Sequence, residues 1–293
     1  MALAVLIVFF VVFFPNIAPA TTTASQARWA PSDAWMSSLY WLKENTPDPF
    51  DNPDAYYELH ELPPPGESYE YPESAYGVLA WWDYGYWITR IAHRIPNANP
   101  SQNPVAVTNV ARIFTSQDED SANEIVKEIG ASYVILDYQT VTGKFHAVAA
   151  WAGSSLEDFF EIYYLPQEGK LMPVQLFYPE YYRSLSTRLY NFDGKAVTAE
   201  NTVVISYEER VSREGVLYKQ ITFAEQFDSY EEAEAYLLSQ EAANYKIVSN
   251  SAFISPVPLD ALEHYRLIHG SDIRVILPEG GTVPVIKIFE YID

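Results

Sequence analysis

The chain has 293 residues, 48% of them hydrophobic, which is enough to bury one large core or two smaller ones. Its 39 Asp and Glu outnumber its 18 Lys and Arg and give a formal charge of -21, so its field would repel phosphate backbones and we expect no nucleic-acid partner. The sequence contains no cysteine, which excludes disulfides, thiolate metal sites and a cysteine nucleophile.

An apolar run at residues 2–14 opens the chain and is shorter than the roughly 20 residues with which a helix crosses a bilayer. The "APA" at residues 18–20 resembles a signal-peptidase site, but no basic residue precedes the run as in a signal peptide. We interpret residues 1–25 as the end of a transmembrane helix, closed by Pro15, and a connector, in a chain whose N-terminal part is missing. The rest is then expected on the extracytoplasmic side of a cell membrane.

Residues 26–194 are expected to form a mainly helical domain. The segment SDAWMSSLYWLKENTP offers Ser32 as an N-cap and apolar residues at helical spacing until Pro47 stops the helix. Residues 48–72 are rich in Pro, Asp, Glu and Tyr and predict a long surface loop.

The next elements are short. Residues 105–110 (VAVTNV) are interpreted as a strand, residues 117–130 as a helix with acidic residues in its first turn, and residues 132–138 (SYVILDY) as a buried strand. Residues 144–153 predict another helix, and residues 156–165 (LEDFFEIYYL) a further amphipathic piece of a mostly helical middle region.

Residues 195–293 are expected to form a β-rich domain, because β-branched and aromatic runs alternate there with turn signals such as Gly280-Gly281. One helix, at SYEEAEAYLLSQ, interrupts these runs. The fold class predicted for the whole chain is therefore α+β, with a short hydrophobic helix at its N-terminus.

Common cofactor and metal motifs are absent from the sequence, among them GxGxxG, the P-loop and HExxH. His264 and His269 are five residues apart, which puts them on different helix faces and argues against a shared metal. The acidic clusters lack the ligand spacing of an EF-hand loop and are interpreted as helix N-termini and solvated faces.

The segment VLAWWDYGYWITR (residues 78–90) sets one carboxylate, Asp83, among indoles and phenols. Such a cluster is more often core than site, but a carboxylate buried without a partner is costly. An ionised carboxylate only accepts hydrogen bonds and an indole N–H only donates them, so Asp83, Trp81 and Trp82 can satisfy one hydroxyl group between them. The residues predict a hydroxyl pocket, and Gly85 would allow a close backbone approach.

The pentapeptide WWDYG at residues 81–85 resembles the signature of the catalytic subunit of oligosaccharyltransferase, and the flanks LYWLKENTPDP, RIPNANPSQ and TGKFHAVAAWAG are similar to its archaeal members. The resemblance implies a membrane enzyme that transfers an oligosaccharide from a lipid-linked donor to Asn in Asn-X-Ser/Thr sequons. It also implies that Trp81, Trp82 and Asp83 bind the sequon hydroxyl, while Tyr84 and Gly85 shape the turn.

A second family element, Asp-x-x-Lys-x-x-x-Met, matches in part. Lys144 and Val148 stand at the Lys and Met positions, but Val141 stands where Asp is expected. The resemblance implies that Val148 contacts a threonine methyl, and it makes Lys144 and Tyr84 further candidates for the pocket wall. Lys144 and Val148 could equally be one turn of a packed helix.

The resemblance implies a divalent metal, Mn²⁺ or Mg²⁺, held by acidic residues of a membrane half that lies outside this chain. We therefore expect no catalytic or metal-ligating residue here, and a chain that binds the acceptor but does not catalyse transfer alone. The alternative from another class is a secreted carbohydrate-binding or adhesive module. A hydrolase with paired carboxylates lacks a second carboxylate near Asp83 in sequence.

Overall fold

The computed structural model describes residues 2–27, 30–50, 52, 54–59, 61, 63–64, 66–67, 69–199, 202–240 and 244–292. The chain divides into two compact units, residues 1–33 and 34–293. The first unit is helical, and the second carries two five-stranded sheets.

The N-terminal unit is one helical rod made of α1 (Ala2–Val8), the π-helical turn η1 (Phe9–Phe13) and α2 (Phe14–Ser25). Its segment Leu3–Ala24 is long and apolar enough to span a membrane by length and composition. The predicted apolar N-terminal helix is thus confirmed, but the prediction that Pro15 ends it is wrong. Pro15 is the second residue of α2 and follows η1 without a break, so the helix continues through it.

The first sheet of the larger unit has the order β2-β1-β3-β12-β9. Its strands are β1 (Gly77–Leu79), β2 (Ile95–Pro96), β3 (Ala131–Asp137), β9 (Tyr265–Gly270) and β12 (Ile286–Tyr291). Strand β1 is parallel to both β2 and β3, whereas β12 is antiparallel to β3 and β9. A separate β-ribbon pairs β10 (Arg274–Ile276) with β11 (Thr282–Pro284).

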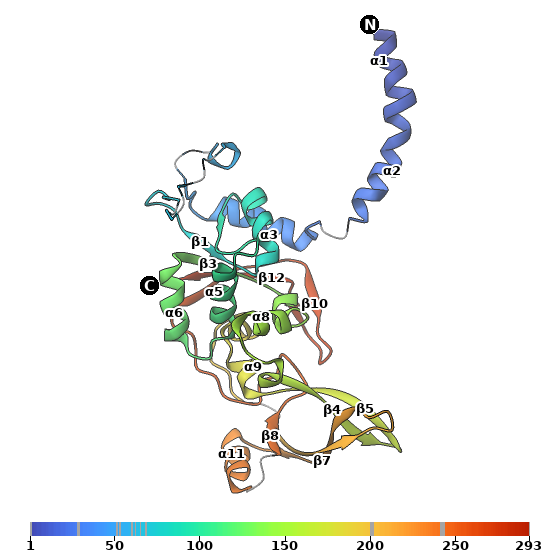
Figure 1. Cartoon of the computed structure of the whole chain (residues 1–293), viewed down its shortest axis with the longest axis vertical. Helices are drawn as coiled ribbons and strands as arrows, with labels where there is room; N and C mark the ends of the chain where they lie inside the picture. Colours follow the sequence, from blue (N-terminus) through green and yellow to red (C-terminus); the bar gives the residue numbers. More distant parts are fainter. Residues whose placement is uncertain are drawn as a thin grey trace. The chain divides into compact units, whose positions relative to one another are not determined.

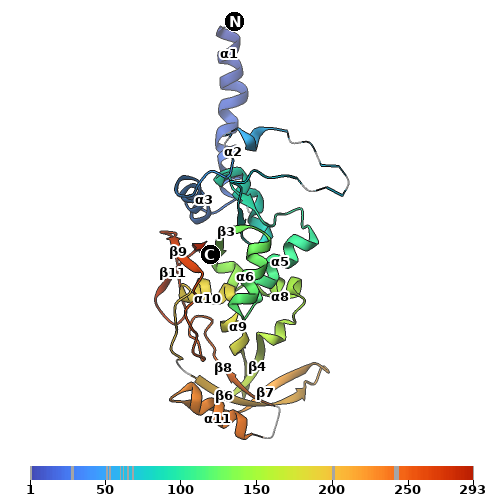
Figure 2. The same cartoon turned by 90° about the vertical axis from the view of Figure 1, so that its left-hand side faces the viewer.

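The second sheet has the order β5-β4-β7-β6-β8 and lies with α11 at the lower end of Figures 1 and 2. Its elements are β4 (Phe160–Gln167), β5 (Lys170–Phe177), β6 (Thr202–Val211), β7 (Leu217–Phe227), β8 (Tyr245–Val248) and α11 (Tyr230–Ser239). Both sheets take strands from either side of residue 195, and the division into domains 26–194 and 195–293 remains a prediction.

The remaining helical elements pack mainly around the first sheet. They are α3 (Asp33–Asn45), η2 (Ala55–Tyr57), η3 (Trp82–Tyr84), α4 (Gly85–Trp87), η4 (Ile88–Ala92), α5 (Pro104–Thr115), α6 (Glu119–Glu128), α7 (Tyr138–Val141), α8 (Phe145–Ala152), η5 (Leu156–Asp158), α9 (Pro179–Arg183) and α10 (Leu185–Phe192). The predicted α+β class is confirmed, as are the helices at α3, α6, α8 and α11 and the strand at β3.

Two local predictions are wrong. The strand expected at residues 105–110 is part of α5, because the Asn103 side chain caps this helix by accepting hydrogen bonds from the backbone N–H groups of Val105 and Ala106. The amphipathic piece at residues 156–165 is a 3-10 turn followed by β4, whose aromatic and β-branched residues pair with β5 along eight positions.

The main core positions the motif. It joins buried apolar residues of α3, β1, β3, α5 and β12, and it includes Trp81, Tyr84 and Val148. Because β1 and β3 are parallel neighbours, with Leu79 opposite Val134, their carboxyl ends lie at one edge of the sheet. The chain that leaves β1 through the WWDYG sequence therefore meets the chain that leaves β3 at Asp137.

Candidate functional site

The WWDYG sequence turns the chain from β1 into a helical segment that runs from Trp82 to Ala92. Trp81 has extended backbone angles (φ -60°, ψ 140°) and precedes the 3-10 turn Trp82–Tyr84. Its side chain is only 1% exposed and belongs to the core, whereas Trp82 and Asp83 are half-buried. The core interpretation thus fits Trp81, and the two residues after it face the surface in part.

Gly85 is required by a close approach of two chain segments. A Cβ added at Gly85 would lie 2.4 Å from the carbonyl oxygen of Ala98 and 2.5 Å from the Cα of Asn99. Its backbone angles are ordinary right-handed helical values (φ -56°, ψ -43°), so the need is for space and not for an unusual conformation. The close approach predicted for this glycine is therefore made by residues 98–99 of the chain itself.

Asp83 is paired with Lys144, a residue 61 positions later in the chain. The Nζ of Lys144 donates to Asp83 Oδ2 at 2.6 Å and to the Oη of Tyr84 at 2.8 Å. The side chains of both ionic partners are 30% exposed. Lys144 also lies 4.3 Å from the centre of the Tyr84 ring. The lysine holds one oxygen of Asp83 and leaves the other free.

A second carboxylate, Asp137, supports this pair from inside the core. It is 3% exposed, and its Oδ2 accepts from the Oη of Tyr84 at 2.5 Å. Its Oδ1 accepts from the backbone N–H of Thr140 at 2.8 Å and from the Thr140 hydroxyl at 2.6 Å, so it also caps α7. Burial, with the Asp137 charge second, raises the pKa of Tyr84 far above its usual range, and the phenol keeps its proton to donate.

Sequence reasoning missed Asp137 and Thr140. Val141, which stands where the family pattern expects an Asp, is fully buried. The carboxylate in contact with the Lys144 network comes instead from Asp137, at the carboxyl end of β3. The signal that could have found it is the single acidic residue that ends the buried run SYVILD.

Two polar atoms of the motif are buried without a hydrogen-bond partner in the described part of the chain. They are the indole Nε1 of Trp82, which can only donate, and the Oδ1 of Asp83, which can only accept when ionised. Native proteins rarely leave such groups unpaired, because each one costs about 1–3 kcal/mol. The motif therefore presents one free donor and one free acceptor on consecutive residues.

The candidate pocket-wall residues differ in accessibility. Tyr84 is 4% exposed and packs against Trp35 in a tilted arrangement with ring centres 4.1 Å apart. Tyr84 is therefore a core residue next to Asp83 in the sequence. Lys144 contacts Asp83 directly. Val148 has no exposed surface, and its contact with a threonine methyl stays a prediction.

The motif does not fit a metal centre. Among the described residues, no group of three or more His, Asp or Glu side chains could hold an ion together. One oxygen of Asp83 already bonds the Lys144 ammonium, and the neighbouring indole N–H is a donor, so both would oppose a cation there. We derive no chemical step through a metal held by these residues.

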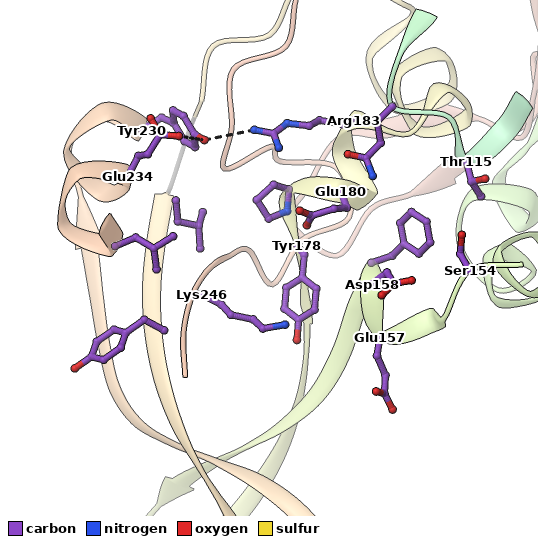
Figure 3. Close-up of a pocket in the computed structure, with 16 residues that line it drawn as sticks. Thr115, Ser154, Glu157, Asp158, Tyr178, Glu180, Arg183, Tyr230, Glu234 and Lys246 are labelled. Atoms are coloured by element: carbon purple, nitrogen blue, oxygen red, sulfur yellow. Dashed lines mark hydrogen bonds between the residues drawn. The ribbon is translucent and has the colours of Figure 1, made fainter. Parts of the chain in front are cut away.

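A cavity of about 690 Å³ lies elsewhere, between α9, η5, α11 and β8, and none of residues 81–85 lines it. Figure 3 shows Lys246 pointing toward Tyr178, with its Nζ 4.0 Å from the ring centre, and Arg183 reaching across to the Tyr230 hydroxyl. None of the buried unpartnered polar atoms found in the described residues belongs to its lining. The motif is therefore the stronger candidate site.

The chain resembles oligosaccharyltransferases in comparisons with known proteins. Residues 32–141 match the family described as the AglB core domain. The chain is 31% identical over 295 residues to the dolichyl-monophosphooligosaccharide-protein glycotransferase AglB of Haloferax volcanii, a match that covers 88% of this chain and 27% of that protein. It is 30% identical over 210 residues to the dolichyl-phosphooligosaccharide-protein glycotransferase 3 of Archaeoglobus fulgidus, covering 63% of this chain and 24% of that protein.

Solved structures share the fold. The Archaeoglobus fulgidus oligosaccharyltransferase tethered with an acceptor peptide containing the NVT sequon gives a TM-score of 0.54 at 22% identity, over 99% of this chain and 36% of that chain. The same protein complexed with Zn and sulfate gives 0.52, also at 22% identity, over 99% and 38%. This chain is therefore similar in sequence and in fold to archaeal oligosaccharyltransferases of the AglB type. It spans about a quarter of the length of the curated relatives.

Proposed function

We propose that this chain takes part in the transfer of an oligosaccharide from a lipid-linked donor to Asn in Asn-X-Ser/Thr sequons, and that its own part is to bind the sequon hydroxyl. The observation that carries the proposal is that the Trp82 Nε1 and the Asp83 Oδ1, on consecutive residues, are both buried without a hydrogen-bond partner in the described part of the chain. A hydroxyl offers one donor and two acceptor lone pairs, so a single Ser or Thr side chain satisfies both atoms.

The supporting residues orient this pair. Lys144 binds Asp83 Oδ2, which fixes the carboxylate plane and leaves Oδ1 as the free acceptor. Tyr84 joins Lys144 to the buried Asp137, so the position of the lysine is set by the core.

Discrimination follows from the cost of leaving these atoms unpaired. Replacing the sequon Thr by Val keeps the shape of the side chain but removes the hydroxyl. Two buried groups then lack partners at about 1–3 kcal/mol each, which corresponds to a roughly 30-fold or larger loss of affinity. Trp81, inside the core, would hold the turn that presents Trp82 and not contact the hydroxyl itself.

We assign acceptor binding to this chain and not the chemical step. The divalent metal, Mn²⁺ or Mg²⁺, would be held by acidic residues outside this chain. The apolar segment Leu3–Ala24 is long enough to span a membrane and supports a membrane location, and we propose that the larger unit lies on the extracytoplasmic side.

The test is the affinity of the chain for two peptides that differ only at the third sequon position, Asn-Val-Thr and Asn-Val-Val. We expect the Thr peptide to bind at least 30-fold more tightly, and Asp83→Ala to abolish the difference. Asp120→Ala, which removes an exposed carboxylate on α6, is the matched control and should retain it. Equal binding of both peptides, glycan binding without peptide binding, or glycopeptide formation by this chain alone would each contradict the proposal.

A further inference from the structure

The face of the helical segment that carries Asp83 continues as an exposed stripe. Asp83, Tyr86 and Arg90 are spaced by three and four residues, which places their side chains on one face. Tyr86 is 54% exposed and Arg90 is also exposed. The opposite face is formed by the buried residues Tyr84, Ile88 and Ala92.

Arg90 is held over an aromatic ring at the end of this stripe. Its Cζ lies 5.1 Å from the ring centre of Tyr57, a residue of η2 that is 59% exposed. The Tyr57 hydroxyl in turn lies 3.3 Å from the Nε2 of His93. The guanidinium thus lies over the Tyr57 ring, and no hydrogen bond of its N–H groups is found within the described part of the chain.

His93, whose Nε2 contacts the Tyr57 hydroxyl, lies near charges of both signs. Burial lowers the pKa of His93, the charges of Lys43, Arg94 and Arg90 lower it further, and the charge of Asp48 acts in the opposite direction. Arg94 is buried and donates to backbone carbonyls, so Lys43 and Arg90 are the cations that face solvent here.

Two acidic side chains of this part of the chain make hydrogen bonds to other groups. Asp48 accepts from the backbone N–H of Phe50, and Glu58 accepts from the side chain of Asn52. Within the described residues Arg90 has no ion pair. A guanidinium with this geometry fits a carboxylate through two parallel hydrogen bonds.

We propose that the stripe formed by Asp83, Tyr86 and Arg90, with Tyr57, is a second contact surface for the acceptor polypeptide, in which Arg90 binds an acidic side chain near the sequon. The inference rests on the proposed function, because it takes the sequon hydroxyl at Asp83 as its starting point. The occupant is argued from charge complementarity and from the continuity of this face with the hydroxyl pocket.

The spacing along the helix gives the position of the acidic residue. Asp83 and Arg90 are seven residues apart, which corresponds to about 10 Å at roughly 1.5 Å per residue. An extended acceptor chain covers this distance in about three residues at roughly 3.3 Å each. The acidic residue should therefore lie about three positions from the sequon Ser or Thr, on the side set by the direction in which the peptide crosses the helix.

The experiment measures the affinity of the whole chain for Asn-Val-Thr peptides in which one Asp is moved through successive positions on both sides of the sequon. We expect binding about three- to tenfold tighter for Asp in one window about three residues from Thr, relative to Asn at the same place. Because the contact is exposed, this preference should shrink in 0.5 M salt, a condition at which the screening length falls to roughly 4 Å.

Arg90→Gln should remove the preference for Asp. Arg90→Lys should keep part of this preference, because the positive charge remains while the two parallel hydrogen bonds of the guanidinium are lost. The matched control is Arg112→Gln, which removes an exposed arginine of α5 and should keep the full preference. Tyr86→Ala should weaken all peptides alike, since its contact is apolar. Thermal unfolding of each variant checks that the fold is intact.

The two proposals fail in different ways. If Thr and Val peptides bind equally, the hydroxyl site fails whatever Arg90 does. If the Thr preference holds but Asp gives no advantage, or gives the same advantage in Arg90→Gln, the acidic-residue contact is overturned alone. Binding of inorganic phosphate at Arg90 without any preference for acidic peptides would overturn it too, in favour of a phosphate ligand.

Discussion

The hydrogen bond from Tyr84 to Asp137 connects the Asp83–Lys144 pair to the core. Tyr84→Phe removes a donor from a carboxylate that is 3% exposed, and it removes one of the acceptors of Lys144. Hydrogen bonds to charged groups contribute about 1.5–3 kcal/mol. We expect Tyr84→Phe to lower the free energy of unfolding by this amount, and Asp137→Asn by a similar amount.

The double variant Tyr84→Phe, Asp137→Asn distinguishes the loss of this hydrogen bond from a general disruption of the core. Because the two side chains contact each other directly, their effects should not add, and we expect a coupling free energy of about 1–2 kcal/mol. Urea unfolding of the whole chain, followed by tryptophan fluorescence, measures it. The control cycle pairs Tyr84→Phe with Asp260→Asn, an exposed residue outside the network, and should be additive. Additivity within about 0.5 kcal/mol in the Tyr84/Asp137 cycle would refute the reasoning.

Three further predictions concern packing and pH. Gly85→Ala should lower the free energy of unfolding by about 1–3 kcal/mol, since its Cβ would meet the Ala98 carbonyl at 2.4 Å; unchanged urea unfolding would contradict this. Burial lowers the pKa of His269 below its ordinary 6.5, so stability should decline as pH falls below that value, and His269→Gln should show a shallower decline in thermal unfolding. Burial acts to raise the pKa of Glu161, but hydrogen bonds from Lys219 and Tyr178 outweigh it, so the pKa lies below its ordinary 4.5. The stability that this group contributes should be present above pH 4.5 and be lost in more acid solution. Glu161→Gln should therefore lose less stability than the unchanged chain over that acid range.

The proposed hydroxyl site can be inferred from the sequence because the chemistry on which it rests is local. Trp82 and Asp83 are adjacent, and the rule that indoles donate while carboxylates accept needs no fold. The structure adds that Trp81 lies in the core and that one oxygen of Asp83 is paired, which leaves a single acceptor. Long helices and the buried strand β3 were also predictable, since their apolar periods are strong.

The supporting network could not be predicted, because it is set by strand pairing. Asp137 lies 53 residues from Tyr84 and reaches it only because β1 and β3 are parallel neighbours. The alternating valines at the start of α5 match the period of two that is typical of a strand. The residues that favour a helix instead are Asn103, which caps α5, and Pro104 at its first position. In a short apolar run, the flanking residues decide between a helix and a strand.

The most direct test of the central claim is the NMR signal of the Trp82 indole N–H, identified by its loss in Trp82→Phe. On addition of an Asn-Val-Thr peptide, this signal should shift as the indole donates to the sequon hydroxyl, and it should not respond to Asn-Val-Val. In Asp83→Ala the response to the Thr peptide should disappear as well. A Trp82 signal that is the same with both peptides would contradict the assignment of Trp82 and Asp83 as the site that binds the sequon hydroxyl.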